Sequence, residues 1–214
     1  MRLFFFGSDE KSECEFCAET RQLLEEVTAL SEHLSLSTYQ LKAAPDVAAR
    51  YKVDIVPSFV IVGRENGSQL DYGIRYKGIP AGHEFTSLIN DLVLVSQRDS
   101  NLSPETRDFL HGLTEPLHLQ VFVTPTCPYC PRAVVLAHQM ALESPMVEAE
   151  MVEATEFPEL ADRFNVSGVP QTTINWGAGT VVGAVPETML VEEIKKAIKV
   201  KSKTNGGAPK TAVE

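Results

Sequence analysis

The apolar positions of the chain predict an alternating order of strands and helices. Short unbroken apolar runs are typical of buried strands, and apolar residues three or four positions apart are typical of helices. Leu23, Leu24, Val27 and Leu30 show the helical spacing. In the first half of the chain we expect strands at 2–7, 34–41, 58–62 and 71–77, and helices at 17–31, just before residue 51, and at 84–95.

The second half of the chain predicts the same order. We expect strands at 117–124, 147–152, 171–175 and 180–185, and helices at 130–142, just before residue 164, and at 187–198. The order strand, helix, strand, helix, strand, strand, helix is that of an α/β fold in which an antiparallel hairpin joins a parallel pair. A further short helix, capped by Ser103 and with Pro104 at its first position, is expected at 104–113.

Two chemical motifs recur at a spacing of 113 residues, which indicates a tandem duplication. The first copy has Cys14, Cys17 and Pro57, and the second has Cys127, Cys130 and Pro170. The polar segment at 98–104 separates the copies, so we place the two units at residues 1–99 and 100–199. Residues 200–214 lack an apolar period, and we expect them to form a disordered tail.

Composition and charge are those of a water-soluble globular protein. Of the 214 residues, 43% are hydrophobic and 22% are charged, which is enough apolar material for two modest cores. The formal net charge of −10 argues against a nucleic-acid partner or an anionic membrane partner. The apolar run at residues 3–6 is too short for a signal peptide or a membrane span, so we expect a cytoplasmic protein.

All four cysteines fall into two Cys-x-x-Cys pairs, Cys14/Cys17 and Cys127/Cys130. In a cytosolic protein such a pair is more often catalytic or metal-binding than a permanent staple. Each pair is predicted to lie where a strand leads into a helix, and the N–H groups and dipole of a helix start lower the pKa of a thiol. We therefore expect Cys14 and Cys127 to be nucleophiles, and Cys17 and Cys130 to resolve the mixed disulfide.

A Val-Pro dipeptide precedes the third strand of each unit, Val56-Pro57 in the first and Val169-Pro170 in the second. A cis peptide bond there would turn the neighbouring backbone groups toward the cysteines and offer a short edge to the backbone of a substrate. Spacing alone leaves the isomer open, because cis bonds are a minority of X-Pro bonds. We expect these four residues to bind substrate.

Two other interpretations of the cysteines have to be weighed. Two Cys-x-x-Cys pairs can form one zinc site, but the pairs of zinc ribbons are usually about 15–20 residues apart, whereas these lie in separate repeats. Each pair could also be a purely structural disulfide. The five histidines are not clustered, so we expect neither a metal nor another cofactor.

The second unit carries the stretch Val123-Thr124-Pro125-Thr126-Cys127-Pro128-Tyr129-Cys130-Pro131, with Val169-Pro170 after it. In these motifs, and in the matching pair and Val-Pro of the first unit, the chain resembles the glutaredoxin-like protein disulfide oxidoreductases of thermophilic archaea and bacteria. The resemblance implies tandem thioredoxin-like folds that share a continuous sheet, cis bonds before Pro57 and Pro170, and thiol–disulfide exchange on protein substrates. It further implies reduction by a thioredoxin reductase-type flavoenzyme.

The chain departs from relatives of this kind in two ways that concern chemistry. Neither first strand carries the buried acid that thioredoxins use for proton transfer. Residues 185–187 lack the acidic pair with which glutaredoxins hold glutathione, so protein dithiols are the better candidate substrates. Two alternative functions stay open: an electron-relay module for a peroxiredoxin, and a zinc-binding or chaperone-like binding module.

The two centres differ in local charge. Asp9, Glu10, Glu13, Glu15 and Glu19 surround the first pair, whereas no acidic residue lies within ten positions of the second. Negative charge disfavours a thiolate, and a stabilised thiolate makes the corresponding disulfide a stronger oxidant. We therefore predict that the second pair is the more oxidising centre.

Overall fold

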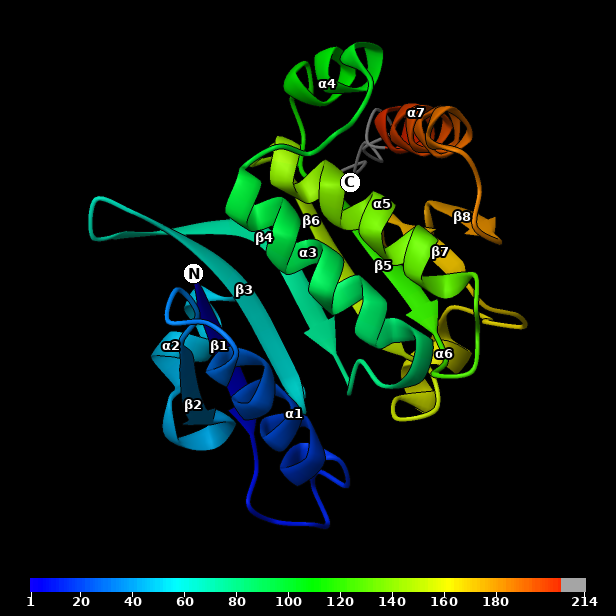
Figure 1. Ribbon diagram of the computed structural model, residues 1–214. Helices are drawn as coiled ribbons and strands as arrows, with labels where there is room; N and C mark the ends of the chain where they lie inside the picture. Colours follow the sequence, from blue (N-terminus) through cyan, green and yellow to red (C-terminus); the bar gives the residue numbers. More distant parts are fainter. Residues whose placement is uncertain (205–214) are drawn as a thin grey trace, which may run out of the picture.

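The two repeats form a single eight-stranded sheet with helices on both faces (Figure 1). The computed structural model describes residues 1–204. The strands are β1 (Arg2–Gly7), β2 (Leu36–Gln40), β3 (Ser58–Glu65), β4 (Ser68–Lys77), β5 (Leu117–Val123), β6 (Val147–Glu153), β7 (Gln171–Ile174) and β8 (Gly179–Val182). The helices are α1 (Cys17–Ala29), α2 (Pro45–Arg50), α3 (Phe85–Gln97), α4 (Pro104–His111), α5 (Cys130–Glu143), α6 (Pro158–Arg163) and α7 (Glu187–Thr204).

Most of the predicted elements are confirmed to within a few residues, and the α/β fold with tandem thioredoxin-like motifs is confirmed. The β3–β4 hairpin is longer than predicted and turns at Asn66 and Gly67, which both adopt positive φ angles. The last helix was expected to end near residue 198 but continues to Thr204, where three alternating lysines are good helix formers. The helix therefore extends past residue 200, where the disordered tail was predicted to begin, and the rest of that predicted tail lies outside the described residues.

The strand order is β2-β1-β3-β4-β6-β5-β7-β8, so the two units meet where β4 pairs with β6. This pairing is parallel and aligns Ile74 with Ala149 and Lys77 with Val152. It confirms the continuous sheet implied by the resemblance. The unit boundary near residue 100 remains a prediction.

The direction of the strands brings both cysteine pairs to one edge of the sheet. β1 is antiparallel to β3, which is antiparallel to β4, and β4, β6 and β5 are mutually parallel. The carboxyl ends of β1, β4, β6 and β5 therefore lie at the same edge. The chain leaves β1 and β5 there toward the cysteines, and it enters β3 and β7 there from the prolines.

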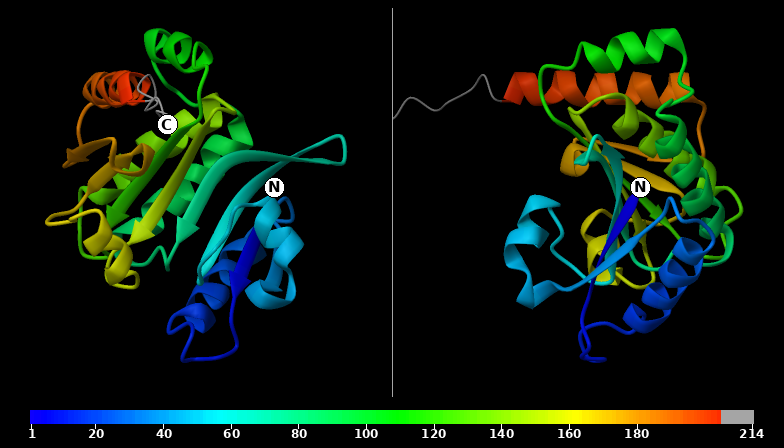
Figure 2. Two further views of the ribbon diagram at one scale, coloured as in Figure 1. Left: turned by 180° about the vertical axis from the view of Figure 1, so that it is seen from behind. Right: turned by 60° about the vertical axis from the view of Figure 1, so that its left-hand side comes forward.

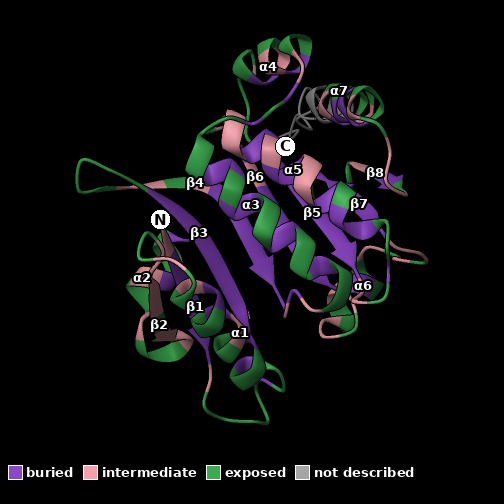
Figure 3. Cartoon of the chain, viewed as in Figure 1, coloured by how far each residue is buried: buried purple, intermediate pink, exposed green. Residues whose placement is uncertain are grey.

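The two faces of the sheet are packed differently. One large apolar cluster on the long-helix face includes residues of α1, α3, α5 and α7. The opposite face, which we call the short-helix face, has two separate clusters, one beneath α2 and one beneath α6. Seen from behind, the central strands run uncovered between these two short helices (Figure 2), although most of their residues are buried (Figure 3).

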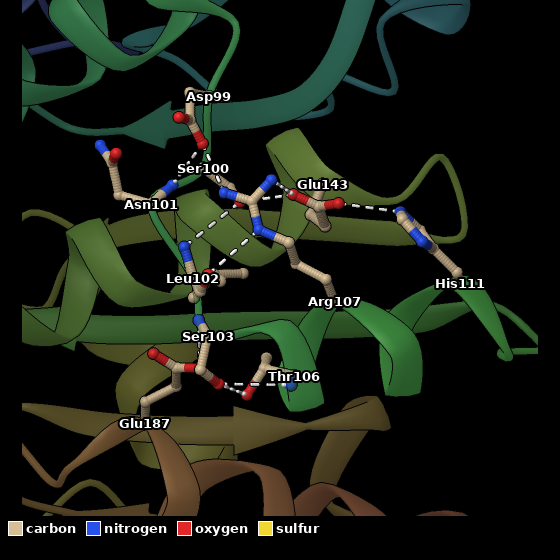
Figure 4. Close-up of polar contacts among 10 residues, drawn as sticks. All are labelled: Asp99, Ser100, Asn101, Leu102, Ser103, Thr106, Arg107, His111, Glu143 and Glu187. Atoms are coloured by element: carbon tan, nitrogen blue, oxygen red, sulfur yellow. Dashed lines mark hydrogen bonds and ion pairs between the residues drawn. The ribbon is translucent and has the colours of Figure 1, made fainter.

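The segment between the units is held by polar contacts around α4 (Figure 4). Ser103 caps α4 as predicted, accepting a hydrogen bond from the N–H of Thr106, and its hydroxyl donates to Glu187 of α7 at 2.6 Å. Arg107 contacts Asp99 and Glu143, and Glu143 lies at the end of α5. The short helix is therefore tied to both α5 and α7.

A buried polar group lies between α3 and α5 on the long-helix face. Asp91 of α3 accepts a hydrogen bond from the Tyr76 hydroxyl, and its carboxylate lies 2.5 Å from Nδ1 of His138 on α5. Glu84, just before α3, is 1% exposed and accepts a hydrogen bond from Ser87. Burial raises the pKa of Glu84 to about 7.

Replacing Glu84 by Gln should change how stability depends on pH. In the unfolded chain the carboxyl ionises near its ordinary pKa of 4.5, whereas the folded protein keeps it protonated up to about 7. As the pH rises from 4.5 to about 7, the unfolding free energy of the wild type should therefore fall by up to about 3 kcal/mol. Above pH 7 it should level off. Urea unfolding of wild type and Glu84→Gln at pH 5 and pH 8 measures the difference, with Glu105→Gln on exposed α4 as the control. Equal pH dependence in all three proteins would contradict the assignment.

Candidate redox centres

Each cysteine pair is closed as a disulfide, with its two Cα atoms 5.5 Å apart. The second cysteine of each pair is the first residue of a helix, Cys17 in α1 and Cys130 in α5, at the predicted helix starts. The first cysteine therefore lies in the turn before the helix. This places it near the free N–H groups of the first helical turn.

The four cysteines are nearly buried but not equally so. Cys127 is 8% exposed and Cys130 is 0% exposed, whereas Cys14 and Cys17 are both 6% exposed. In the second pair this difference favours Cys127 as the residue that an incoming sulfur can reach. In the first pair exposure does not distinguish the two.

Both predicted cis peptide bonds are present, at Val56-Pro57 and at Val169-Pro170. The sulfur of Cys127 lies 3.8 Å from the carbonyl oxygen of Val169. When the pair is reduced, a thiol at this position can donate to that carbonyl. The Val-Pro loop and the cysteine turn, 42 residues apart in the chain, therefore meet as the sequence predicted.

The backbone after each proline is held in the same way in both units. The carbonyl oxygen of Pro57 accepts the N–H of Gly78 at 2.8 Å, and that of Pro170 accepts the N–H of Gly183 at 2.7 Å. At the first centre the N–H of Ser8 also lies 3.3 Å from Sγ of Cys17. A donor at this distance stabilises a thiolate more than a thiol.

The first centre borders a cleft of about 780 Å³ that has more acidic than basic side chains in its lining. The lining side chains include Asp9, Glu15 and Glu19 together with Lys11 and Arg21. One of the acidic residues near this pair in sequence is already neutralised, because Glu13 forms an ion pair with Lys42 that lowers the pKa of its carboxyl. Around the second pair, Pro128, Tyr129 and Arg132 are exposed.

A segment of the first unit, residues 78–83, contacts the surroundings of both centres. Gly78 binds Pro57, as described, and the N–H of Ile79 donates to Oε1 of Glu156 at 2.6 Å. The N–H of His83 donates to the carbonyl oxygen of Pro125, two residues before Cys127. The segment is therefore a shared wall between the two centres.

Sequence reasoning missed Glu156, which follows β6 in the second unit. Burial raises the pKa of its carboxyl to about 7; the hydrogen bond from Ile79 opposes this shift, and the charges of Glu153 and Glu15 add to it. Glu15 lies between Cys14 and Cys17, so a charge at the first centre helps to raise the pKa of an acid in the second unit. No local motif marks Glu156, because its partners belong to the other repeat.

Within residues 1–204 no group of three or more His, Cys, Asp or Glu side chains is placed to hold a metal ion. In the same part of the chain no helix has the length and apolarity to cross a membrane.

Comparison with known proteins identifies the fold family. A model of the thioredoxin domain matches residues 117–199. A protein disulfide oxidoreductase from Aeropyrum pernix K1 superposes with a TM-score of 0.83 and 31% identity over 93% of this chain and 86% of its own. The chain belongs to the thioredoxin-fold disulfide oxidoreductases.

Other members of this family come from a second group of proteins. The NTD_N/C domain of the alkylhydroperoxide reductase AhpF from Enterococcus faecalis has a TM-score of 0.80 and 27% identity over 90% of this chain and 89% of its own. The F component of the alkyl hydroperoxide reductase of Staphylococcus epidermidis is 31% identical over 77% of this chain. The chain spans 28% of the length of that relative.

Replacing Gly82 by Ala should disturb the second centre. A Cβ at this position would lie 2.3 Å from the carbonyl oxygen of Pro125, and the φ angle of +59° is unfavourable for alanine. We expect a loss of about 1–2 kcal/mol from the backbone conformation and a slower reaction of Cys127 with a disulfide reagent. Gly67→Ala is the matched control, because its φ is also positive but no atom lies within 4 Å. If Cys127 reacts at the same rate in the two variants, residues 78–83 do not position the turn that holds Pro125 and Cys127.

The second centre should have the higher reduction potential. Its surroundings lack the acidic side chains of the first, and a difference of roughly 30 mV would correspond to about 1.4 kcal/mol. Equilibration with redox buffers measures each potential separately in Cys14→Ser/Cys17→Ser and Cys127→Ser/Cys130→Ser proteins. Glu15→Gln should raise the potential of the first centre, since it removes a negative charge beside the thiolate. A lower potential at Cys127–Cys130 than at Cys14–Cys17 would refute this ordering.

Proposed function

We propose that this protein exchanges disulfides with protein dithiols and disulfides at both centres. The observation that carries the proposal is the pairing of a redox cysteine at a helix start with a cis-Pro loop, seen directly in the 3.8 Å approach of Cys127 to Val169. The substrate chain then binds at Val56, Pro57, Val169 and Pro170, where the two valines are half-buried and the two prolines are buried. Two such centres at one edge of the sheet support a role as an oxidoreductase rather than a passive binder.

The chemistry follows the order of the cysteines. In the reducing direction the thiolate of Cys14 or Cys127 attacks one sulfur of a substrate disulfide, which forms a mixed disulfide and releases the other substrate sulfur as a thiolate. Cys17 or Cys130 then loses its proton and attacks the mixed disulfide. The substrate gains two electrons and two protons, and the enzyme pair becomes a disulfide. The reverse sequence oxidises a substrate dithiol, and isomerisation combines the two.

The same residues serve reduction, oxidation and isomerisation, so direction depends on the partners. The resemblance to protein disulfide oxidoreductases supports a thioredoxin reductase-type flavoenzyme as the electron donor in the cytoplasm. The two units at 1–99 and 100–199 then act as two exchange modules joined by one sheet.

A second candidate function is an electron relay to a peroxiredoxin. Relatives at about 30% identity are named as the F component of alkyl hydroperoxide reductase, and this chain corresponds to 28% of the length of one of them. In this role one centre would receive electrons from a flavoprotein, and the disulfide of a peroxiredoxin would accept them.

Insulin reduction with dithiothreitol tests the leading proposal. The wild type should accelerate precipitation of the insulin chains, Cys127→Ser should lose most of this activity, and Cys14→Ser should lose less. The reason is that no acidic residue lies within ten positions of the second pair, so a larger fraction of the Cys127 thiol is expected to be thiolate, the form that attacks a disulfide. A protein with bound zinc and no acceleration would support the binding module instead.

A second experiment, on protein that has been chemically reduced and freed of reductant, distinguishes the electron relay from general disulfide exchange. Reoxidation by a two-cysteine peroxiredoxin plus peroxide, much faster than by insulin, would favour the relay over general exchange. Oxidation at comparable rates by both would favour a broad protein disulfide oxidoreductase.

A further inference from the structure

A cavity of about 400 Å³ with both apolar and charged lining residues opens on the short-helix face, where the two units meet. Its wall includes Asp54 and Ile55 of the first unit and Gln120, Glu156 and Trp176 of the second. Its lining also includes Lys77 of β4, and Phe157 and Leu160 of the apolar cluster beneath α6. Nothing in the exchange chemistry described above uses it.

The floor of the cavity is a buried ionic group. Lys77 of β4, whose side chain is 6% exposed, lies 3.0 Å from Asp54 and 3.3 Å from Glu150. Burial alone would raise the pKa of Glu150, but contacts with His118, Lys77 and Gln120 outweigh it and bring the value to about 2. Lys77 is therefore already neutralised by two carboxylates, and its charge is not free to attract an anion.

Two acceptors of the wall have no donor among the described residues. Gln120 is 1% exposed; its Nε2 donates to Glu150 at 3.0 Å, and its Oε1 has no protein partner. Glu156 accepts the N–H of Ile79 with Oε1, and its Oε2 is buried without a partner. Buried acceptors of this kind are nearly always paired in proteins, so the wall is complementary to a group rich in N–H donors.

The remaining charges favour a cation. Beyond the pair formed by Lys77 and Asp54, the lining carries Glu159 and Arg163, of opposite charge, and Glu156, whose pKa burial raises to about 7; a cation beside Glu156 would favour its ionised form. Trp176 is 63% exposed and stacks on His118 with ring centroids 4.0 Å apart, which leaves its other face open. An ammonium or guanidinium group binds well over an indole ring.

The cavity adjoins the first centre. Asp54 and Ile55 directly precede the cis Val56-Pro57 bond, where the substrate backbone is expected to bind. Pro57 binds Gly78, and the next residue, Ile79, binds Glu156. A polypeptide held at Pro57 can therefore extend over Ile55 into the cavity.

We propose that this cavity binds a lysine or arginine side chain of the polypeptide whose sulfurs exchange at Cys14–Cys17. The proposal rests on the proposed function and adds a substrate class to it. The first centre then selects disulfides or dithiols with a basic residue close in sequence, and the orphan acceptors of Gln120 and Glu156 receive its donors.

Two synthetic peptide disulfides test the selection. Both contain the same internal disulfide, and one carries lysine where the other carries norleucine, two residues beyond the reacting cysteine. The chemically reduced full chain is used in the Cys127→Ser/Cys130→Ser background, so that only the first centre reacts, and quenched-flow chromatography gives the second-order rate constants. The lysine peptide should react about tenfold faster, as expected for one charge-assisted contact.

Substitutions of residues that line the cavity should reduce the ratio of the rate constant of the lysine peptide to that of the norleucine peptide. Glu156→Gln keeps the shape of the side chain and should reduce the ratio to about threefold or less, because one charged acceptor is lost. Trp176→Ala provides a second variant on the rim, where folding is least at risk, and should also narrow the ratio. Glu105→Gln removes an equal charge from α4, far from the cavity, and should leave the rates for both peptides unchanged.

The outcomes separate this proposal from the proposed function. Equal rates for the two peptides would refute the proposed binding of a basic side chain in the cavity. A lysine preference that Glu105→Gln reduces as much as Glu156→Gln would refute it too. Either result would leave the proposed disulfide exchange intact. No exchange with either peptide would overturn the proposed function and this proposal with it.

Discussion

The parallel pairing of β4 with β6 is the interaction on which the rest of the molecule depends. It joins two repeats into one sheet and makes the carboxyl ends of four strands lie at a single edge. That arrangement places both disulfides, both cis-Pro loops and the shared wall at residues 78–83 at the same edge. Without this pairing each unit would expose an unpaired strand edge, which is a template for aggregation.

The junction also explains why the two faces of the sheet differ. Along β4, Ile74 and Tyr76 face the continuous core on the long-helix face, so the alternating residues Arg75 and Lys77 face the opposite side. The partner strand places Glu150 on that side as well. Charge is thus concentrated at the centre of the short-helix face, although the three side chains are themselves buried and Arg75 donates a hydrogen bond to the carbonyl oxygen of Tyr51 at the end of α2.

Much of this structure could be predicted from the sequence, and the successes have a common cause. The repeat at 113 residues, the two cysteine pairs and the Val-Pro dipeptides are local patterns, and each marks a backbone feature that a few adjacent residues determine. The ends of elements were less accurate: α7 continues beyond residue 198 to Thr204, where the sequence is rich in lysine, a good helix former.

The residues that were missed act across the junction. Glu156 meets Ile79 across 77 positions of sequence, and Glu84 becomes an unusual acid only because α3 and α5 enclose it. Neither shows any sign of this in its own neighbourhood along the chain. The ion pair between Glu13 and Lys42 at the first centre was missed for the same reason, since the two residues lie 29 positions apart.

Trp176 gives the molecule an optical property that follows from its position. It is the one tryptophan of the 214 residues, its ring is 63% exposed, and it rests on a histidine at the rim of the cavity between the units. Indole emission from this protein therefore comes from a single place and responds to the polarity and ionisation around it. The unmodified chain carries its own fluorescent reporter at the junction of its two halves.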